Sequence, residues 1–422
     1  MSRIIEHFTT LTQIPHCSKD TQAMRDFLVD FASRYGYSVD LDKSDNILIS
    51  KEHPMLALQA HYDMVCMGKA PKIEVYTQDD CLRAKDASLG ADNGMAIAMM
   101  MVLMEDGYDL EFLLTADEEV GLIGANSVDF ELKSRYMLNL DSEEEGELCI
   151  GCAGGIDIKA YKEIEWVKNS DENFYEASIQ GLPGGHSGVD IDKGVPNAIK
   201  ELASFVEKSD ASIITIEGGE RTNSIPSNVR AHISSKVKLE NEGDIILKDI
   251  YRKLLKPKCD IAKIIESIPH GVIRANETFD IPDVSQNLAI IHGDEKSLEI
   301  ILSIRAMDMA DLEMQAKKMI SVFEYQGFSV EKRDKYPAWT PERNDFTNIV
   351  EESLKSVFKE AKTKAIHAGL ECGVLKEKYP DILFASIGPT IRYPHSIREE
   401  VDIASVEKTF EVVKSIITEV SR

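Results

Sequence analysis

The sequence predicts an α/β fold in which a mostly parallel central sheet, flanked by helices, is interrupted by a smaller α+β domain. Short apolar segments alternate with helical patterns up to about residue 140, as is typical of a parallel sheet. From about Ile156 apolar and polar residues alternate instead, which is the pattern of half-exposed antiparallel strands. Strands and helices alternate again after about residue 336, so the C-terminal segment is expected to complete the first domain.

We expect three segments, because a chain of 422 residues is long for one domain. The predicted segments are residues 1–165 for the first part of the main domain, 166–335 for the inserted domain and 336–422 for the second part of the main domain. The segment Tyr336–Pro341, which contains two prolines, marks the return to the main domain.

Helices and strands follow from the spacing of apolar residues. Met95–Glu105 is apolar nearly all round, which predicts a buried helix. The other predicted helices are residues 3–13, 21–35, 197–208, 309–325, 346–359 and 403–420. The predicted strands are residues 39–41, 47–49, 56–60, 110–115, 136–140, 174–180, 229–239, 298–304, 364–367 and 382–387, with a polar hairpin at 73–82.

Composition excludes several classes of partner. The formal net charge of −25 argues against a nucleic-acid surface, which needs clustered Lys and Arg, and against docking on an anionic membrane. The N-terminal residues lack the apolar region of a signal peptide. Seven cysteines, an odd number scattered through the chain, favour a reducing compartment over a disulfide framework. We therefore expect a cytoplasmic protein with no nucleic-acid or membrane partner.

Two side chains that suit a metal site follow the strand predicted at 56–60. Side chains on an extended backbone repeat every second residue, so His61 and Asp63 point to the same side. An imidazole and a carboxylate at a strand end are typical of a metal ligand and its orienting partner. Alone, such a histidine is more often an ordinary core or surface residue, and the other strand ends decide between the two interpretations.

Further acidic and histidine side chains follow the other predicted strands. They are Asp92 in a glycine-rich loop, Glu118 and Glu119 after strand 110–115, Asp141 after strand 136–140, and His395 after strand 382–387. Because sites in parallel sheets form at the carboxyl ends of the strands, we expect these side chains to gather at one edge of the sheet.

A charge count makes two metal ions plausible at this edge. Two imidazoles with several carboxylates suit zinc, or cobalt or manganese. The carboxylates of Asp92, Glu119 and Asp141 bring three negative charges, and two divalent ions would bring four positive charges. The difference matches one bridging hydroxide. With Asp92 as the bridge, each ion receives one histidine and one further carboxylate. Glu118 then remains as a general base and Asp63 as the residue that orients the first histidine.

With these residues the chain resembles a known family, the dinuclear zinc peptidases of the M20 type. Within that family it resembles the bacterial aminoacyl-histidine (Xaa-His, cytosol non-specific) dipeptidases. The likeness runs almost from end to end. The motifs that carry it are His61–Cys66, Leu89–Gly94, Thr115–Gly121, Asn139–Gly146, Leu182–Gly188, Thr222–Pro226 and Pro394–His395.

The resemblance implies a zinc-exopeptidase-like catalytic domain and a role for each site residue. It implies that His61 and Asp141 hold one zinc, that Glu119 and His395 hold the other, that Asp92 bridges them, that Glu118 is the general base and acid, and that Asp63 orients a ligand. It also implies that the peptide bond between Asp92 and Asn93 is cis.

The inserted domain would then be a lid that also forms a homodimer. The resemblance implies that His186 stabilises the oxyanion, and that in homodimeric members the neighbouring subunit supplies it. Asn223 and Arg305 match positions that hold the free carboxylate of the substrate, a role for which a guanidinium group is well suited. Gly388 would line the pocket, and the expected substrate is a small peptide.

Other conspicuous features are expected to be structural. The acidic run Glu143–Glu147 is predicted to lie on the solvated surface. Cys149 and Cys152 have the spacing of a redox pair but lie in a strand-like segment, not at a helix N-terminus. The histidines without a ligand context are His7, His16, His53, His232, His270, His292 and His367.

These observations leave several functional hypotheses. The first is a cytoplasmic, homodimeric metallopeptidase that hydrolyses dipeptides, either Xaa-His or with broad specificity. The alternative keeps the metals but acts on tripeptides or N-acyl amino acids, as an aminoacylase or deacylase, and the ligands alone do not distinguish the two. A non-catalytic protein on the same fold is disfavoured because every ligand and Glu118 are present. A redox protein built on Cys149 and Cys152 is the last hypothesis.

Overall fold

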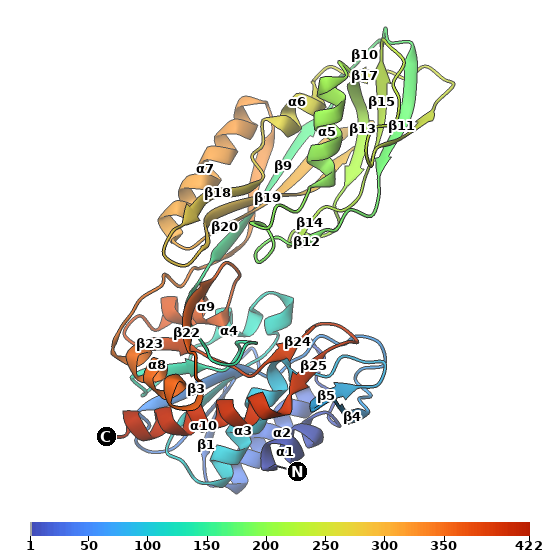
Figure 1. The fold of residues 1–422 in the computed structure, drawn as a ribbon. Coiled ribbons are helices and arrows are strands. Elements are labelled where there is room, and N and C mark those ends of the chain that lie inside the picture. The colour runs from blue at the N-terminus through green and yellow to red at the C-terminus, as the bar shows by residue number, and fades with distance from the viewer. Residues whose placement is uncertain (1) are drawn as a thin grey trace. The chain divides into compact units, whose positions relative to one another are not determined.

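The computed structural model describes residues 2–422, which form two compact units. Unit 1 contains the chain up to Gly151 together with residues 341–365 and 370–422, and unit 2 contains residues 152–340 and 366–369. Figure 1 shows each unit with its own sheet and helices. The divisions after residues 151 and 340 differ from the predicted 165 and 335, because strands β9 (Gly154–Glu163) and β21 (Ser329–Tyr336) belong to the sheet of unit 2.

An eight-stranded sheet in the order β1-β2-β6-β3-β7-β23-β8-β22 forms the centre of unit 1. Strands β6, β3, β7 and β23 run parallel to one another, whereas β1 with β2, β2 with β6 and β23 with β8 are antiparallel. The predicted α/β class is confirmed, with a sheet that is parallel at its centre and mixed outside it. The strand ends that matter for the site belong to this parallel centre.

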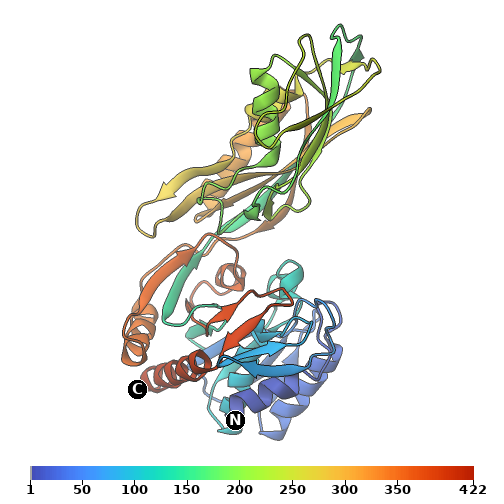
Figure 2. The same cartoon turned by 45° about the vertical axis from the view of Figure 1, so that its right-hand side comes forward.

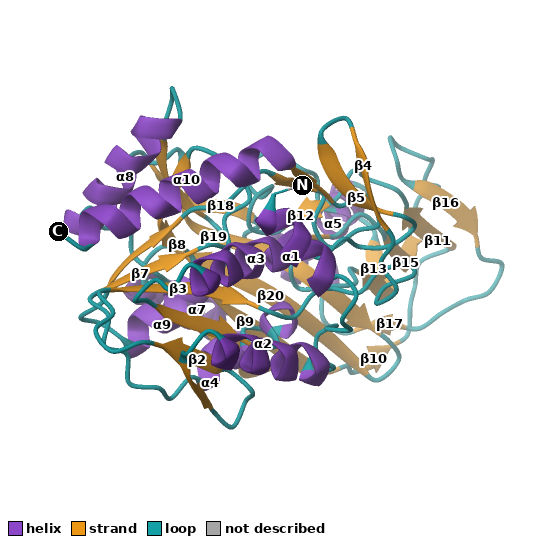
Figure 3. Ribbon diagram, turned by 90° about the horizontal axis from the view of Figure 1, so that it is seen from below, coloured by secondary structure: helices purple, strands orange, loops and turns teal. Residues whose placement is uncertain are grey.

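Helices cover both faces of this sheet, so its central strands are buried throughout. Every residue of β3 is buried, as expected for a strand between two helical layers. Helices α3 and α10 lie on one side of the sheet, and α4 and α9 lie on the other (Figures 1 and 3). Helix α3 is apolar nearly all round because it packs between the sheet and helices α1 and α2.

The elements of unit 1 begin and end as follows. Its helices are α1 (Arg3–Leu11), α2 (Gln22–Arg34), α3 (Ala91–Glu105), α4 (Ile123–Ser127), α8 (Asp345–Val357), α9 (Glu371–Lys378) and α10 (Ile403–Val420). Its strands are β1 (Ser38–Leu41), β2 (Ile47–Ser50), β3 (Leu56–His61), β4 (Val75–Gln78), β5 (Cys81–Ala84), β6 (Glu111–Thr115), β7 (Tyr136–Asn139), β8 (Glu147–Cys152, ending in unit 2), β22 (Lys362–Ile366), β23 (Leu383–Ser386), β24 (Ile391–Arg392) and β25 (Glu400–Asp402).

A second, four-stranded sheet of unit 1 has the order β24-β25-β5-β4. Its strands β24 and β25 form an antiparallel hairpin, and β25 pairs with β5. The loop of this hairpin carries His395, so this small sheet holds one of the predicted ligands.

Unit 2 is an antiparallel sheet with helices packed on it, which agrees with the predicted α+β character. The main sheet has the order β16-β11-β15-β13-β19-β20-β9-β21, and β18 pairs with β19. Helices α5 (Ala198–Lys208), α6 (Ile261–Glu266) and α7 (Met309–Tyr325) share one hydrophobic core with this sheet (Figure 2). The remaining strands of unit 2 are β10 (Trp166–Val167), β11 (Asn173–Ile179), β12 (Gly185–His186), β13 (Ser212–Gly218), β14 (Ser224–Ile225), β15 (Val229–Ser235), β16 (Ile246–Asp249), β17 (Lys256–Pro257), β18 (Gly271–Asn276), β19 (Ile281–Gly293) and β20 (Ser297–Ala306).

The predicted elements are present, and the differences concern their extent and number. Helix α3 begins at Ala91 and not at Met95, but its start is kinked, because Asp92 and Asn93 have non-helical dihedral angles. The elements that were not predicted include helices α6 and α9 and the strands β9, β13, β18 and β19. None of the helices among residues 2–422 has the length and apolar character needed to cross a membrane.

Candidate metal centre

Neighbouring parallel strands place His61 and Asp141 side by side. His61 is the last residue of β3, and Asp141 lies two residues beyond the end of β7, which pairs with β3 in parallel. The Nε2 atom of His61 is 3.4 Å from an oxygen of Asp141. Glu118 and Glu119 follow β6, the parallel neighbour of β3 on its other side.

Asp92 lies between the two histidines, in the first turn of α3. Its Oδ1 atom is 3.1 Å from Nε2 of His61, and its Oδ2 atom is 3.1 Å from Nε2 of His395. The same nitrogen of His395 is 2.9 Å from Glu119. The peptide bond after Asp92 is cis, as the resemblance implied.

Two groups of side chains therefore have the spacing needed to hold a metal ion, and they share Asp92. One consists of His61, Asp92 and Asp141, and the other of Asp92, Glu119 and His395. Within each group the ligand atoms lie within 4.8 Å of one another. A third, overlapping group joins His61 to Glu118 and Glu119.

Asp63 orients His61 from the side away from the other carboxylates. The Nδ1 atom of His61 lies 3.0 Å from the backbone oxygen of Asp63 and 3.5 Å from its carboxylate. Because Nδ1 has these acceptors, Nε2 is left to face Asp92 and Asp141. The carboxylate of Asp63 in turn accepts hydrogen bonds from the amide of Glu118 (3.0 Å) and from Oγ of Ser18 (2.8 Å).

The carboxylates strongly favour positive charge at both imidazoles. Burial lowers the pKa of His61, but Asp141, Asp63 and Asp92 outweigh it and raise that pKa well above its usual value. Hydrogen bonds with Asp92 and Glu119 raise the pKa of His395 to about 11. Burial raises the pKa of Asp92, yet its bonds to the two imidazoles bring that pKa below its usual value.

The donor set fits divalent cations. Buried carboxylates at this spacing repel one another unless positive charge lies between them. Metal ligation would replace the imidazole protons by ions at the same nitrogen atoms. Nitrogen and oxygen donors without a thiolate suit zinc, and also cobalt or manganese.

Glu118 lies at the centre but belongs to neither of the two groups that share Asp92. Burial is the largest cause that raises the pKa of Glu118 well above its usual value, and the charges of Asp141, Glu119 and Glu371 add to it against the effect of His61. A buried carboxyl group with a raised pKa holds a proton more readily than an exposed one.

The expectation that the acidic run Glu143–Glu147 lies on the solvated surface is wrong for most of the run. Glu144 is exposed, whereas Glu143, Glu145 and Glu147 are half-buried and Gly146 is buried. Burial, with the charges of Asp92 and Asp141, raises the pKa of Glu143 to about 8. The amide of Ile391 donates to the backbone oxygen of Glu143 at 3.1 Å, which holds this residue beside the centre, whereas Glu144 is exposed.

A buried polar network behind the strand ends was missed by the sequence analysis. Glu371 accepts hydrogen bonds from Nε2 of Gln59 (2.5 Å) and from Oγ1 of Thr115 (2.7 Å). Gln59 accepts from Asn139 at 2.6 Å, and Asn139 accepts from Ser386 at 2.5 Å. The sequence contains a pattern that could have predicted this network. Gln59 and Asn139 are polar residues in otherwise apolar strands, and each stands two positions before a ligand.

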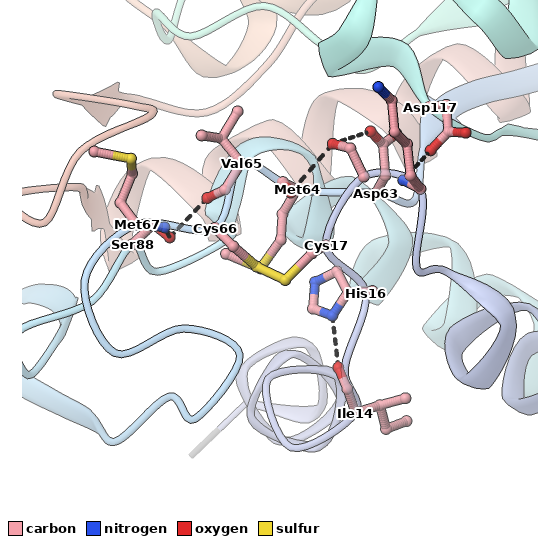
Figure 4. The surroundings of a disulfide bond; sticks show 12 residues. Ile14, His16, Cys17, Asp63, Met64, Val65, Cys66, Met67, Ser88 and Asp117 are labelled. Carbon is pink, nitrogen blue, oxygen red and sulfur yellow. Dashed lines mark hydrogen bonds between the residues drawn. A yellow bond between two sulfur atoms is a disulfide. The ribbon is translucent and has the colours of Figure 1, made fainter.

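The structure contains a disulfide, between Cys17 and Cys66, which the cysteine count did not predict. Backbone pairing of Cys17 with Met64 places the segment after α1 beside the segment after β3, and the two cysteines lie at this junction (Figure 4). Parity and spacing carry no information about this contact between distant segments. The next residue, Ser18, donates to Asp63, so the disulfide adjoins the residue that supports the partner of His61.

Two of the predicted substrate-binding residues of unit 2, His186 and Asn223, lie at two short paired strands. His186 on β12 pairs with Ser224 on β14, and the carbonyl of Asn223 accepts from the amide of Ser187 at 2.8 Å. The Nδ1 atom of His186 accepts from the amides of Gly188 (3.2 Å) and Val189 (3.3 Å). Because Nδ1 is an acceptor, the neutral ring carries its proton on Nε2.

Arg305 and Gly388 have different surroundings. Arg305 lies on β20 of unit 2 and is buried, with Nη1 donating to the hydroxyl of Tyr336 at 2.6 Å. Its Nε atom has no hydrogen-bond partner among residues 2–422. Gly388 lies in unit 1, where a Cβ atom would stand 1.6 Å from the carbonyl oxygen of Ser142, so only glycine fits beside the Asp141 segment.

Replacing Cys17 and Cys66 together by serine should lower the free energy of unfolding by about 4 kcal/mol, because the bridge closes a loop of 49 residues. Chemical denaturation of protein purified without reductant measures this change. Reductant should bring the native protein to the stability of the double variant, and thiol titration of the denatured native protein should find five thiols. Seven titratable thiols would contradict the bridge.

Comparisons with known proteins agree along the whole chain. A sequence profile described as peptidase family M20/M25/M40 matches residues 57–419. The chain is 31% identical to the cytosol non-specific dipeptidase of Escherichia coli over 468 aligned residues, which cover 98% of this chain and 96% of that protein. The crystal structure of aminoacylhistidine dipeptidase from Vibrio alginolyticus superposes with a TM-score of 0.85 at 28% identity, covering 99% and 96% of the two chains. A tripeptidase from Staphylococcus aureus shares the fold, with a TM-score of 0.63 at 18% identity and 100% and 98% of the chains covered. The chain is therefore a hydrolase that belongs to peptidase family M20/M25/M40.

Proposed function

We propose that this protein is a dipeptidase that uses two divalent metal ions, most readily zinc, to hydrolyse Xaa-His or other dipeptides. The observation that carries the proposal is the pair of ligand groups that share Asp92, with Glu118 beside them. Its family and the full-length likeness to two dipeptidases support the choice of substrate.

In this proposal His61 and Asp141 hold one ion, Glu119 and His395 hold the other, and Asp92 binds both. The two oxygens of Asp92 already face different histidines, which is the arrangement a bridging carboxylate needs. Two divalent ions bound by these residues would supply Lewis acidity toward the peptide carbonyl and would lower the pKa of a bound water molecule. Asp63 keeps Nε2 of His61 directed toward this centre.

Glu118 acts as general base and then as general acid. Its carboxylate accepts a proton from the attacking water and passes that proton to the nitrogen of the departing amine. The position of Glu118 supports this role, because its carboxylate lies within 4.8 Å of ligand atoms of His61 and Glu119. The amide of Glu118 donates to Asp63 at 3.0 Å, which ties the base to the residue that orients His61.

His186, Asn223, Arg305 and Gly388 are proposed to bind the substrate. A proton on Nε2 lets neutral His186 donate a hydrogen bond to the oxyanion that forms during hydrolysis. A buried guanidinium with an unpartnered Nε suits the free carboxylate of a dipeptide, and Asn223 would share that carboxylate.

We also propose that the chain forms a homodimer through unit 2 and acts in the cytoplasm. Strand β16 lies at the edge of the main sheet, and the segment around it exposes the apolar side chains of Val237, Ile246, Tyr251 and Leu255. The name of the Escherichia coli relative supports a cytosolic location.

Replacing Glu118 by alanine should reduce dipeptide hydrolysis at least about 100-fold and leave close to two metal ions per chain, because Glu118 moves a proton and is not a ligand of either ion. Turnover of a dipeptide panel and elemental analysis of the same samples measure the two effects. Glu144→Ala, which changes an exposed acid nearby, is the matched control and should keep full activity.

The same panel tests the substrate class. Xaa-His and other dipeptides with free termini should be hydrolysed faster than tripeptides and N-acyl amino acids, and a chelator should abolish turnover reversibly. A preference for N-acyl amino acids or tripeptides would favour the alternative substrates, and full turnover by Glu118→Ala would remove the proposed base.

Aspartate at both Val237 and Tyr251 should convert the dimer to monomers, because two charges would be buried at the proposed interface. Sedimentation velocity measures the change. Tyr325→Asp alters an equally exposed residue of α7 and should leave the dimer intact. A native protein that sediments as a monomer at all concentrations would refute the proposal.

A further inference from the structure

We infer that Glu399 positions the bridging ligand, by holding the start of helix α3 against the loop that carries His395. This inference rests on the proposed metal centre and concerns the affinity of that centre for its ions. Glu399 is a positioning residue in this account, because it acts through Asp92 and His395 and not on the substrate.

The carboxylate of Glu399 is buried among backbone amides. The side chain is 3% exposed. One oxygen accepts from the amides of Leu89 at 2.7 Å and Gly90 at 3.0 Å. The other accepts from Ala91 at 2.8 Å and from Asp92 itself at 3.3 Å. One side chain therefore contacts four consecutive backbone groups, the last of which belongs to the proposed bridge.

The start of helix α3 is irregular, because the backbone of Asp92 (ψ of 106°) and Asn93 (φ of −112°) is not helical, and it has no side-chain cap of its own. Its N-cap residue is Gly90, with φ of +72°, which has no side chain to offer. Backbone amides at such a start have no acceptor in a preceding helical turn, and a buried amide without an acceptor costs free energy. Glu399 supplies this acceptor from about 300 residues further along the chain.

Glu399 is also joined to His395 by a short, internally bonded loop. The amide of Glu399 donates to the carbonyl of Ser396 at 3.2 Å, and the hydroxyl of Ser396 donates to the carbonyl of Tyr393 at 2.7 Å. Directly after Glu399 the chain enters β25, which pairs with β5. His395 therefore sits in a loop with Glu399 at one end, and Glu399 fixes that end to the backbone of Asp92.

The two proposed metal positions should depend on Glu399 to different degrees. His61 and Asp141 follow paired strands, so the sheet itself holds them in place. In the other group, Asp92 and His395 come from a helix start and a loop that meet through Glu399. Loss of the Glu399 carboxylate should therefore weaken the Asp92–Glu119–His395 position more than the His61–Asp92–Asp141 position.

The test is a zinc titration of the metal-free protein and of Glu399→Gln, in competition with a chromogenic chelator. Glutamine has the same shape but turns an NH2 group toward two of the four amides. We expect two ions to bind the native protein, and one of the two to bind the variant about 10- to 100-fold more weakly. Glu399→Asp, which keeps the charge but shortens its reach, should give a smaller loss and provides a second variant if Glu399→Gln does not fold.

The control is Glu400→Gln, which changes the next residue, an acid paired with Arg83 at 2.6 Å and Arg392 at 3.5 Å. It should bind both ions as the native protein does. A purely structural role for Glu399 would lower the melting temperature of metal-free protein while leaving both zinc affinities unchanged, and that result would overturn the inference. Failure of the native protein to bind two ions would instead overturn the proposed centre.

Discussion

The repulsion among three carboxylates, those of Asp92, Glu119 and Asp141, is the constraint on which the site in unit 1 depends. Asp92, Glu119 and Asp141 repel one another in a site where little water can screen them. Two imidazoles face these carboxylates, and the raised pKa values of both histidines express the same demand for positive charge. Bound cations would neutralise these carboxylates, so the same group of side chains explains both the raised pKa values and the proposed metal binding.

Some ligands follow strands of the central sheet, and the others lie on a helix start and a loop. Parallel strands β3, β6 and β7 end at one edge, and a network through Gln59 and Glu371 ties their ends together. The other ligands, Asp92 and His395, come from a helix start and a hairpin loop, and Glu399 joins these two segments. Ser18, beside the disulfide, instead donates to Asp63, which orients His61 at the end of β3.

Much of this arrangement could be predicted from local patterns. Strand ends followed by His or an acidic residue identified the side chains of the centre, because a parallel sheet brings its carboxyl ends together. These supporting contacts could not be predicted in this way. Glu399 and the Cys17–Cys66 bridge act across long sequence separations, and neither follows a periodic pattern. The burial of Glu143 could not be predicted, because a run of acidic residues is typical of solvated surface and the backbone hydrogen bond from Ile391 to Glu143 joins segments far apart in the sequence.

The most direct test of the account is anomalous diffraction from crystals of the zinc-loaded protein. The account predicts two peaks roughly 3.5–4 Å apart, one against each oxygen of Asp92, with one histidine on each ion. A single peak, or two peaks that do not share Asp92, would contradict it.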